Sequence, residues 1–245
     1  MLTGRKCVHW HECFFASPDT PCHRGRERNG RRLRLRYALA DSAVARVTSI
    51  GRKTQAISHP KLEEIIHRDF ADCSTLAGAL SGQDAAVFCL GTYTGSVSDA
   101  ELRKITVDYT VEFARVLHGG SPGAAFSFLS GNGADPTGRS RLAFARYKGE
   151  AEKALLGAGF PQVYIFRHAY IYPVEPRMEP NLSYRLLRAV YPAFRALFPN
   201  QVIPADDLAR VMVEVVVQKI PKPERQIFET GTSAPWRSLA DVHQR

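Results

Sequence analysis

The sequence predicts an α/β fold in which a mostly parallel sheet is doubly wound, with helices on both of its faces. Short apolar runs that are typical of buried parallel strands recur along the chain, as in 85–90 (AAVFCL) and 124–129 (AAFSFL). Amphipathic stretches of helical length, such as 99–117 and 140–156, stand between such runs. Strands that alternate with helices of this length indicate βαβ units, whose right-handed crossovers place helices on both faces of the sheet.

The remaining elements follow from local patterns. Strands are expected at 44–50 (VARVTSI), 62–66 (LEEII) and 163–166 (VYIF), and the end of a helix at 37–40. Shorter helices are expected over 74–80, with Ser74 as the N-cap, and over 206–219, which begins at two acidic residues. Residues 182–198 predict a basic amphipathic helix, a pattern that fits packing against the domain or, alternatively, peripheral contact with a membrane surface.

Basic residues are concentrated at the N-terminus. The chain has 33 Lys and Arg against 24 Asp and Glu, a net charge of +9. Residues 1–36 hold nine Lys and Arg and three Asp and Glu, a net charge of +6, so the rest of the chain has a net charge of +3. We therefore expect residues 1–36 to be a disordered leader. Residues 37–245 would then form the folded domain, with a small helical lid region at about 174–245. The weakly charged body gives no reason to expect nucleic acid as a partner.

The cysteines predict neither a disulfide framework nor a metal site. There are five of them, an odd number with scattered spacing, which fits a reduced, cytoplasmic setting. Cys7, Cys13 and Cys22 lie among histidines, but the paired CxxC spacing of zinc sites is missing, so no metal is expected. No apolar run approaches the ~20 residues that span a bilayer, and the N-terminus lacks the apolar core of a secretory signal.

The topology predicts where a ligand binds. In doubly wound sheets, ligands lie beyond the carboxyl ends of the strands. The residues that follow the expected strands are therefore the candidate site residues: Gly51, Arg52 and Lys53, then Asp69 and Phe70, then Gly91 and Thr92, and finally Ser130 and Gly131.

The order of several short motifs resembles a known family. The runs VTSIGRK, RDFAD, VFCLGTYTG, FLSGNGAD, YKGEAE and IFRHAYIYP follow one another with the spacing of the NAD-dependent epimerase/dehydratase family. Within that family the chain is similar to atypical extended short-chain dehydrogenases/reductases of the Tat-interacting-protein type. The resemblance covers about 35–173, and more weakly continues to about 219. It implies a Rossmann-like NAD(P)-binding domain and oxidoreductase chemistry.

The resemblance implies a set of cofactor-binding residues. Arg52 and Lys53 stand where a basic side chain suits the 2′-phosphate of NADP, so NADP is the expected cofactor and NAD the alternative. Asp69 and Phe70 match the positions that flank adenine, although Asp69 is equally typical of a turn. Gly91 and Thr92 match a backbone segment that passes close to the cofactor, which a glycine permits.

The expected pyrophosphate site has no counterpart in the sequence. The family opens with a strand and a glycine-rich turn whose backbone N–H groups hold the phosphates. Before Tyr37 there are only Gly4, Gly25 and Gly30 among many arginines, with no apolar strand ahead of the last two. Either the first strand and loop are missing and the dinucleotide site is damaged, or residues 1–36 are a frameshifted reading of an ordinary first strand and loop.

The resemblance also implies a catalytic serine, tyrosine and lysine. Ser130 matches the serine, with Gly131 as the alternative by one residue. Lys148 matches the lysine, which in the family lowers the pKa of the tyrosine and binds the nicotinamide ribose, so Lys148 is also an expected cofactor-binding residue. Tyrosine and lysine must be four residues apart to share a helix face, but that position holds Phe144. Tyr147 is a substitute only if the helix is shifted, because it lies about 100° around the helix from Lys148.

Two functions therefore remain open. The first is an NAD(P)-dependent short-chain dehydrogenase/reductase or epimerase that transfers hydride at a carbonyl or sugar carbon of a small molecule. The second is a nucleotide-binding module without catalysis that serves as a regulatory or interaction scaffold. Phe144 favours the second, whereas Ser130 and Lys148 favour the first.

Overall fold

A parallel sheet dominates the computed structural model, which describes residues 6–11, 28–55, 57–92, 97–168, 170–172, 202–218 and 227–229. Seven strands pair in the order β3-β2-β1-β4-β5-β6-β9, and every pairing is parallel. The strands are β1 (Lys6–His11), β2 (Val44–Gly51), β3 (Leu62–Ile66), β4 (Ala85–Phe88), β5 (Ala125–Leu129), β6 (Gln162–Arg167) and β9 (Ile227–Glu229). A separate pair joins β7 (Tyr170–Tyr172) to β8 (Val202–Pro204).

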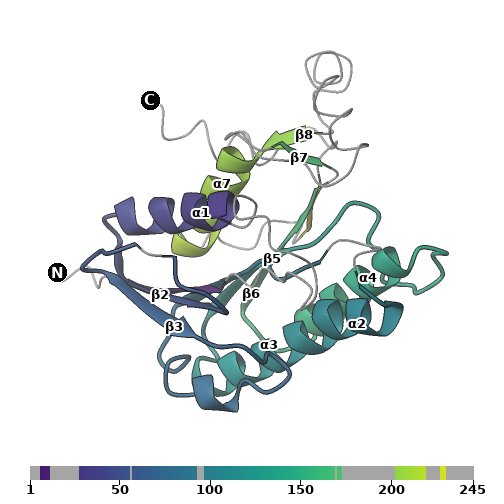
Figure 1. The fold of residues 1–245 in the computed structure, drawn as a ribbon, viewed down its shortest axis with the longest axis horizontal. Coiled ribbons are helices and arrows are strands. Elements are labelled where there is room, and N and C mark those ends of the chain that lie inside the picture. The colour runs from purple at the N-terminus through teal and green to yellow at the C-terminus, as the bar shows by residue number, and fades with distance from the viewer. Residues whose placement is uncertain are drawn as a thin grey trace.

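Helices cover both faces of the sheet, so the expected doubly wound α/β fold is confirmed (Figure 1). On one face lie α1 (Arg28–Ala40) and α7 (Ala205–Val217). On the other lie α2 (Asp99–Arg103), the π-helical turn η2 (Lys104–Asp108), α3 (Tyr109–Gly120) and α4 (Ala143–Leu156). Each face has its own apolar core, because the strand residues alternate between the two sides.

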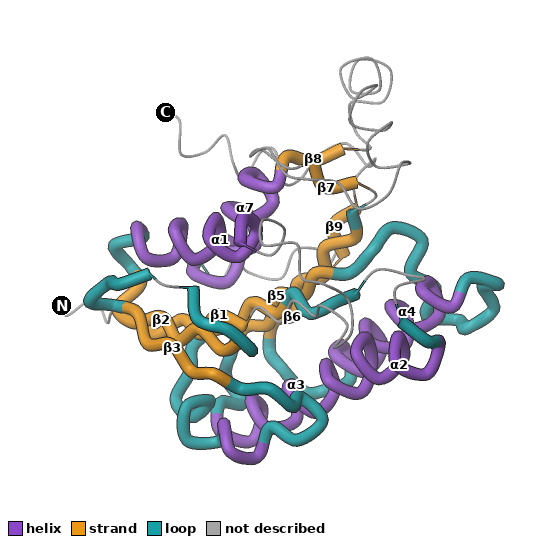
Figure 2. Tube along the Cα trace, in the orientation of Figure 1, coloured by secondary structure: helices purple, strands orange, loops and turns teal. Residues whose placement is uncertain are grey.

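Strand β1 overturns the expectation of a disordered leader. It lies in the middle of the sheet (Figure 2) and pairs with β2 on one side and β4 on the other. In this register His11 lies level with Ile50 of β2 and Phe88 of β4. Helix α1 begins at Arg28, so residue 37 does not separate a leader from the folded domain. The segment KCVHWH has too few apolar residues for its strand to be recognised, because pairing on both sides replaces local propensity here. Residues 12–27, the place of the expected glycine-rich loop, lie outside the described residues.

The other expected elements are largely confirmed, with two corrections. The expected helix over 74–80 is a single 3-10 turn, η1 (Ser74–Leu76), and Ser74 is not its N-cap. Instead the Asp72 carboxylate accepts a hydrogen bond from the Ser74 N–H at 2.9 Å. The expected helix over 99–117 is continuous but changes to π-helical geometry at η2.

The C-terminal third is only partly described. Helix α7 confirms the expected helix at 206–219, and the Tyr37 hydroxyl donates to the Asp206 carboxylate at 2.5 Å, which joins α1 to α7. The expected helix at 182–198 lies outside the described residues, as does most of the expected lid region. Among the helices that the structure does describe, none is long and apolar enough to cross a bilayer.

Helix α4 packs unusually closely on the loop that precedes it. A Cβ atom at Gly149 would overlap backbone atoms of Asp135 and Pro136, so only glycine fits there. The loop itself is fixed by the Asp135 carboxylate, which accepts hydrogen bonds from Thr137 N at 2.9 Å and Ser140 N at 2.6 Å. The Thr137 hydroxyl is the first of the donors that lower the pKa of Asp135.

We expect Gly149→Ala to destabilise the fold by about 1–3 kcal/mol, because backbone atoms must move to admit the methyl group. The measurement is the midpoint of chemical denaturation. Gly157→Ala is the matched control, since a Cβ at this helix end would meet its nearest neighbour, the Lys153 carbonyl oxygen, at 3.5 Å. Equal midpoints for the two variants would contradict the packing argument.

Candidate functional site

The carboxyl edge of the sheet places the candidate residues along one side of the molecule. The strand order reverses between β1 and β4, which is where open α/β sheets bind their ligands. Because the strands are parallel, the segments that follow β2, β3, β4, β5 and β6 all emerge at this edge. The edge therefore collects Arg52 and Lys53, Asp69, Gly91 and Thr92, Ser130 and Gly131, and His168.

The loop after β2 is held by a carboxylate from β3. Glu64 accepts a hydrogen bond from the backbone N–H of Gln55 at 2.7 Å and one from the Thr54 hydroxyl at 2.6 Å. The loop therefore leaves the sheet edge in a fixed path, with Arg52 half-buried and Lys53 exposed. The role in binding the 2′-phosphate of NADP that the resemblance implies for Arg52 and Lys53 stays a prediction.

Asp69 lies in a turn, whereas Phe70 belongs to the apolar core. The Asp69 carboxylate accepts a hydrogen bond from the Ala71 N–H at 3.0 Å, as the turn interpretation of this residue requires. Phe70 is fully buried and meets the His67 ring edge-on at a centroid distance of 4.9 Å. Its ring thus presents no face to adenine, and only the exposed Asp69 remains available to a ligand at this point of the edge.

Gly91 and Thr92 continue the edge beyond β4. Both residues are half-buried. A Cβ built on Gly91 would meet no atom within 4 Å, so the backbone here borders open space rather than another element. A ligand has room to pass close to this backbone, in keeping with the role that the resemblance implies.

The rotation of α4 agrees with the i, i+4 prediction that Lys148 and Tyr147 point in different directions. Lys148 points to the sheet, where its ammonium donates to the Leu129 carbonyl at 3.0 Å and lies 4.9 Å from the centre of the Phe128 ring. Tyr147 points elsewhere: its hydroxyl donates to the Asp99 carboxylate at 2.6 Å, and this bond raises the pKa of Tyr147. The helix is not shifted, so Tyr147 does not replace the expected tyrosine in this structure.

Phe144 lies directly against Gly131. A Cβ atom at Gly131 would overlap the tip of the Phe144 ring and would stand only 2.9 Å from its Cε1 atom. The ring therefore occupies the space that a side chain at position 131 would need. The residue that faces position 144 is therefore Gly131, the alternative position for the serine.

Ser130 is engaged in a buried network instead. Its hydroxyl donates to the Glu152 carboxylate, which lies one helical turn beyond Lys148 and two turns beyond Phe144. Glu152 also pairs with Arg167 at 2.5 Å, and Arg167 pairs with Glu229 at 2.8 Å. The hydrogen bond that Arg167 donates to Glu152 is the largest cause of the raised pKa of Arg167. The Ser130 hydroxyl thus serves the packing of α4 on β6, and the catalytic role predicted for it has no geometric support.

Two site features were missed from the sequence. Glu152 shares the face of Lys148 by i, i+4 spacing, so the pattern YKGEAE contained a signal for it. Asp99 gave no signal, because its contact with Tyr147 joins two helices that are distant in sequence. Within the described ranges, no three His, Cys, Asp or Glu side chains gather as metal ligands would. Cys13 and Cys22 of the weighed zinc interpretation lie outside those ranges.

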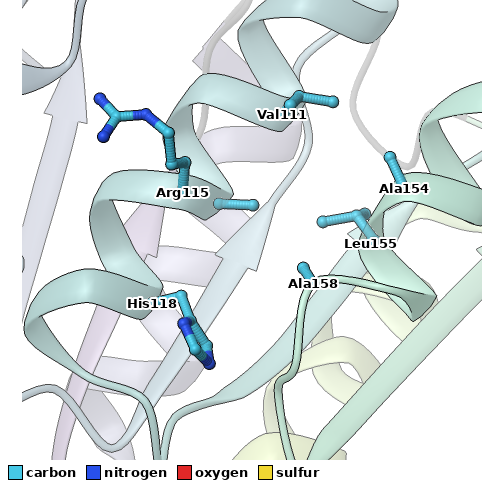
Figure 3. Close-up of a pocket in the computed structure, with 7 residues that line it drawn as sticks. Val111, Arg115, His118, Ala154, Leu155 and Ala158 are labelled. Atoms are coloured by element: carbon cyan, nitrogen blue, oxygen red, sulfur yellow. The ribbon is translucent and has the colours of Figure 1, made fainter.

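A shallow groove between α3 and α4 is separate from this edge (Figure 3). It is lined by Val111, Ala114, Arg115, His118, Ala154, Leu155 and Ala158. The lining residues of α3 run along most of that helix, and those of α4 lie at its C-terminal end and in the turn after it, whereas Phe144 and Lys148 lie in the N-terminal half of α4. The groove therefore contains none of the predicted site residues.

No protein-family model matches the sequence, and no curated protein matches it. Solved structures do match the fold. A short chain dehydrogenase from Burkholderia cenocepacia, in complex with NADP, has a TM-score of 0.61 at 14% identity, over 98% of this chain and 93% of that chain. The Bordetella bronchiseptica enzyme WbmH, in complex with NAD+, has a TM-score of 0.62 at 16% identity, over 99% and 93%.

A third match widens the range of chemistry on this fold. UDP-N-acetylglucosamine 4-epimerase from Bacillus cereus has a TM-score of 0.59 at 12% identity, over 97% of this chain and 84% of that chain. At such identities the likeness defines the fold and leaves the activity to the site. This chain has the Rossmann-type fold of NAD(P)-dependent short-chain dehydrogenases and epimerases.

The burial of Lys148 predicts a pH dependence of stability. Burial lowers the pKa of this ammonium from 10.5 to about 8. Between these values the unfolded chain binds more protons than the folded chain, so the free energy of unfolding rises with pH from about 8 to 10.5. Below pH 8 both states are protonated and the cost of burying the charge is fully present.

Lys148→Met should therefore flatten the pH dependence of the denaturation midpoint in this alkaline window. Lys153→Met on the same helix is the control, because Lys153 is exposed. If the midpoint of Lys148→Met depended on pH as steeply as that of the unmodified chain, the Lys148 ammonium would be solvated and the argument from burial would be wrong.

Proposed function

We propose that this chain is an NAD(P)-binding protein with the short-chain dehydrogenase/reductase fold that holds a nucleotide without the usual proton relay. The single observation that carries the proposal is the contact of the Phe144 ring with Gly131. Two residues without hydroxyl groups thus stand at the positions that the resemblance implies for the tyrosine and, in the alternative alignment, for the serine. The protein would then work as a nucleotide-dependent binding module rather than as an oxidoreductase.

Nucleotide binding is supported by the residues at the carboxyl edge. Arg52 and Lys53 follow β2, and a basic side chain there suits the 2′-phosphate of NADP. Open space borders the backbone at Gly91, on the other side of β1. Lys148 stands at the end of β5, where the family resemblance assigns it to the nicotinamide ribose. Structures with this fold hold NADP or NAD+, which favours the same class of ligand here.

The proton relay lacks its donor. In the family chemistry a serine orients the substrate oxygen and a tyrosine gives or takes its proton. Phe144 has no ionisable group, Gly131 has no side chain, and the hydroxyl of Ser130 is bound to Glu152. Tyr147 is bound to Asp99 on another face of α4. Lys148 remains in place, but there is no tyrosine beside it whose pKa it would lower.

The ligand beside the nucleotide is proposed to be a small molecule with a carbonyl or sugar group. Among proteins of this fold, one acts as a UDP-N-acetylglucosamine 4-epimerase and another as a uronate dehydrogenase. Both names describe chemistry on sugars. Without the proton relay, the protein would act as a regulatory scaffold. Its partner would then respond to whether the nucleotide is bound.

NADPH should bind more tightly than NADH, because Arg52 can pair with the 2′-phosphate. Arg52→Ala should weaken NADPH about 10- to 100-fold and leave NADH nearly unchanged, as loss of a charge-assisted hydrogen bond predicts. The measurement is isothermal titration calorimetry. Arg46→Ala is the matched control, since Arg46 lies near the start of the same strand and pairs with Glu63 at 3.5 Å. Equal affinities of the unmodified chain for the two cofactors would contradict the role of Arg52.

Carbonyl reduction by the unmodified chain should be negligible, and restoring the hydroxyl groups should raise it. Gly131→Ser with Phe144→Tyr should increase NADPH-dependent turnover of a permissive quinone by about 10²–10⁴-fold, the usual contribution of a general acid. Phe144→Tyr alone should gain less, because no serine then orients the substrate oxygen. The assay follows NADPH absorbance.

Two controls define this experiment. Tyr147→Phe should change nothing, because the Tyr147 hydroxyl faces Asp99. Lys148→Ala in the doubly substituted chain should remove the gain. If the unmodified chain shows clear turnover that Tyr147→Phe abolishes, Tyr147 is the acid and the proposal of a lost relay is wrong.

A further inference from the structure

The loop between β5 and α4 is braced so that it projects from the carboxyl edge. Figure 1 shows it reaching past the N-terminal end of α4. The Asp135 N–H donates to the Ala145 carbonyl at 2.8 Å, and the Thr137 hydroxyl donates to the Asp135 carboxylate at 2.6 Å. Arg146 of α4 donates to the Ser140 carbonyl at 2.9 Å. These bonds give the loop a defined shape before any partner binds.

Leu142 ends this loop with its side chain in water. It is 70% exposed, the largest exposed fraction among the large apolar residues of the described ranges. It is also the N-cap of α4, a position that favours Ser, Thr, Asp or Asn, and it makes no cap hydrogen bond. A leucine here therefore lacks the stabilisation of a polar cap and gains little from burial. Residues that break such local preferences often serve binding rather than folding.

The residues around Leu142 are basic. Arg139 and Arg141 are both exposed, and the run 136–149 contains no Asp or Glu. The loop thus presents one apolar side chain beside two guanidinium groups. Such a surface is complementary to an anionic surface that can also take up an apolar side chain.

The apolar area at this loop is too small for a stable protein interface. Such interfaces bury about 800 Å² on each partner around an apolar centre. The other exposed large apolar residues of the described ranges, Ile66, Val111 and Leu156, belong to β3, α3 and the opposite end of α4. A membrane surface needs no such patch, because a single apolar side chain can enter the acyl boundary while neighbouring arginines meet the lipid phosphates.

We propose that the loop carrying Arg139, Arg141 and Leu142 docks the protein on an anionic membrane surface. Leu142 enters the boundary between headgroups and acyl chains, and the two guanidinium groups pair with the anionic headgroups. Docking by one leucine and two arginines is weak and reversible. Because Gly131 and Phe144 lie at the two ends of this loop, docking brings the candidate site to the membrane surface. The inference goes beyond nucleotide binding and does not depend on it.

Co-sedimentation of the full chain with lipid vesicles tests the docking. The chain should bind vesicles of equal parts phosphatidylcholine and phosphatidylserine, and should bind phosphatidylcholine vesicles about tenfold more weakly or less. Leu142→Ser should weaken binding to the anionic vesicles about tenfold, because the apolar side chain is lost, whereas Leu142→Phe should retain it. Without vesicles, Leu142→Ser should melt at the same temperature as the unmodified chain or higher, since serine is a preferred N-cap.

Matched variants separate the loop from the charge and apolar surface of the whole chain. Leu156→Ser removes a leucine that is 41% exposed at the other end of α4, and it should leave vesicle binding nearly unchanged. Arg139→Gln with Arg141→Gln should weaken binding to the anionic vesicles about 10- to 30-fold. Lys153→Gln with Arg46→Gln removes two exposed cations elsewhere and should have a much smaller effect.

Each outcome decides the inference. No binding to either vesicle, equal binding to both, an unchanged affinity or a lower melting temperature of Leu142→Ser, or equal losses for the two pairs of cations would overturn it. If Leu142→Ser instead abolished a dimer in sedimentation velocity without vesicles, a second copy would cover Leu142 and the inference would be wrong. None of these results bears on nucleotide binding, which the calorimetric titrations decide.

Discussion

The buried ion pair between Glu152 and Arg167 fixes the geometry on which the site depends. It ties α4 to the carboxyl end of β6, and the Glu152 carboxylate also holds the hydroxyl of Ser130. Removing one partner of such a pair typically costs about 3–5 kcal/mol, because a buried charge is left unpaired. With α4 held in this rotation, Lys148 reaches the Leu129 carbonyl and Tyr147 turns to Asp99. The close approach at Gly149 keeps the same helix against the loop that precedes it.

That fixed rotation brings Phe144 against Gly131. Phe144 faces the sheet because it shares a helix face with Lys148, and its ring covers Gly131 because glycine leaves that space empty. A hydroxyl at one position without the other would rebuild the relay only in part, since one group orients the substrate oxygen and the other transfers the proton. An apolar contact between Phe144 and Gly131 thus lies one helical turn from the buried ammonium of Lys148.

The two halves of the sheet carry different groups at their carboxyl ends. The half formed by β1, β2 and β3 has a basic residue after β2 and a carboxylate from β3 that holds the same loop. The half formed by β4, β5 and β6 has Lys148 against the Leu129 carbonyl and His168, a buried imidazole for which the described residues provide no hydrogen-bond partner. Nucleotide binding and proton transfer depend on different residues on this fold, so one can be retained when the other is lost.

The sequence by itself determined the fold class, most of the strands and the orientation of α4. Apolar runs bounded by turn residues gave β4 and β5, and i, i+4 spacing showed that Phe144 stands where the tyrosine belongs. The sequence did not determine β1, because a strand paired on both sides needs little propensity of its own and KCVHWH shows almost none. Nor did it determine which of Ser130 and Gly131 faces Phe144, that Phe70 is buried, or that His168 lacks a partner. Only the tertiary structure decided these, because each depends on contacts between segments that are distant along the chain.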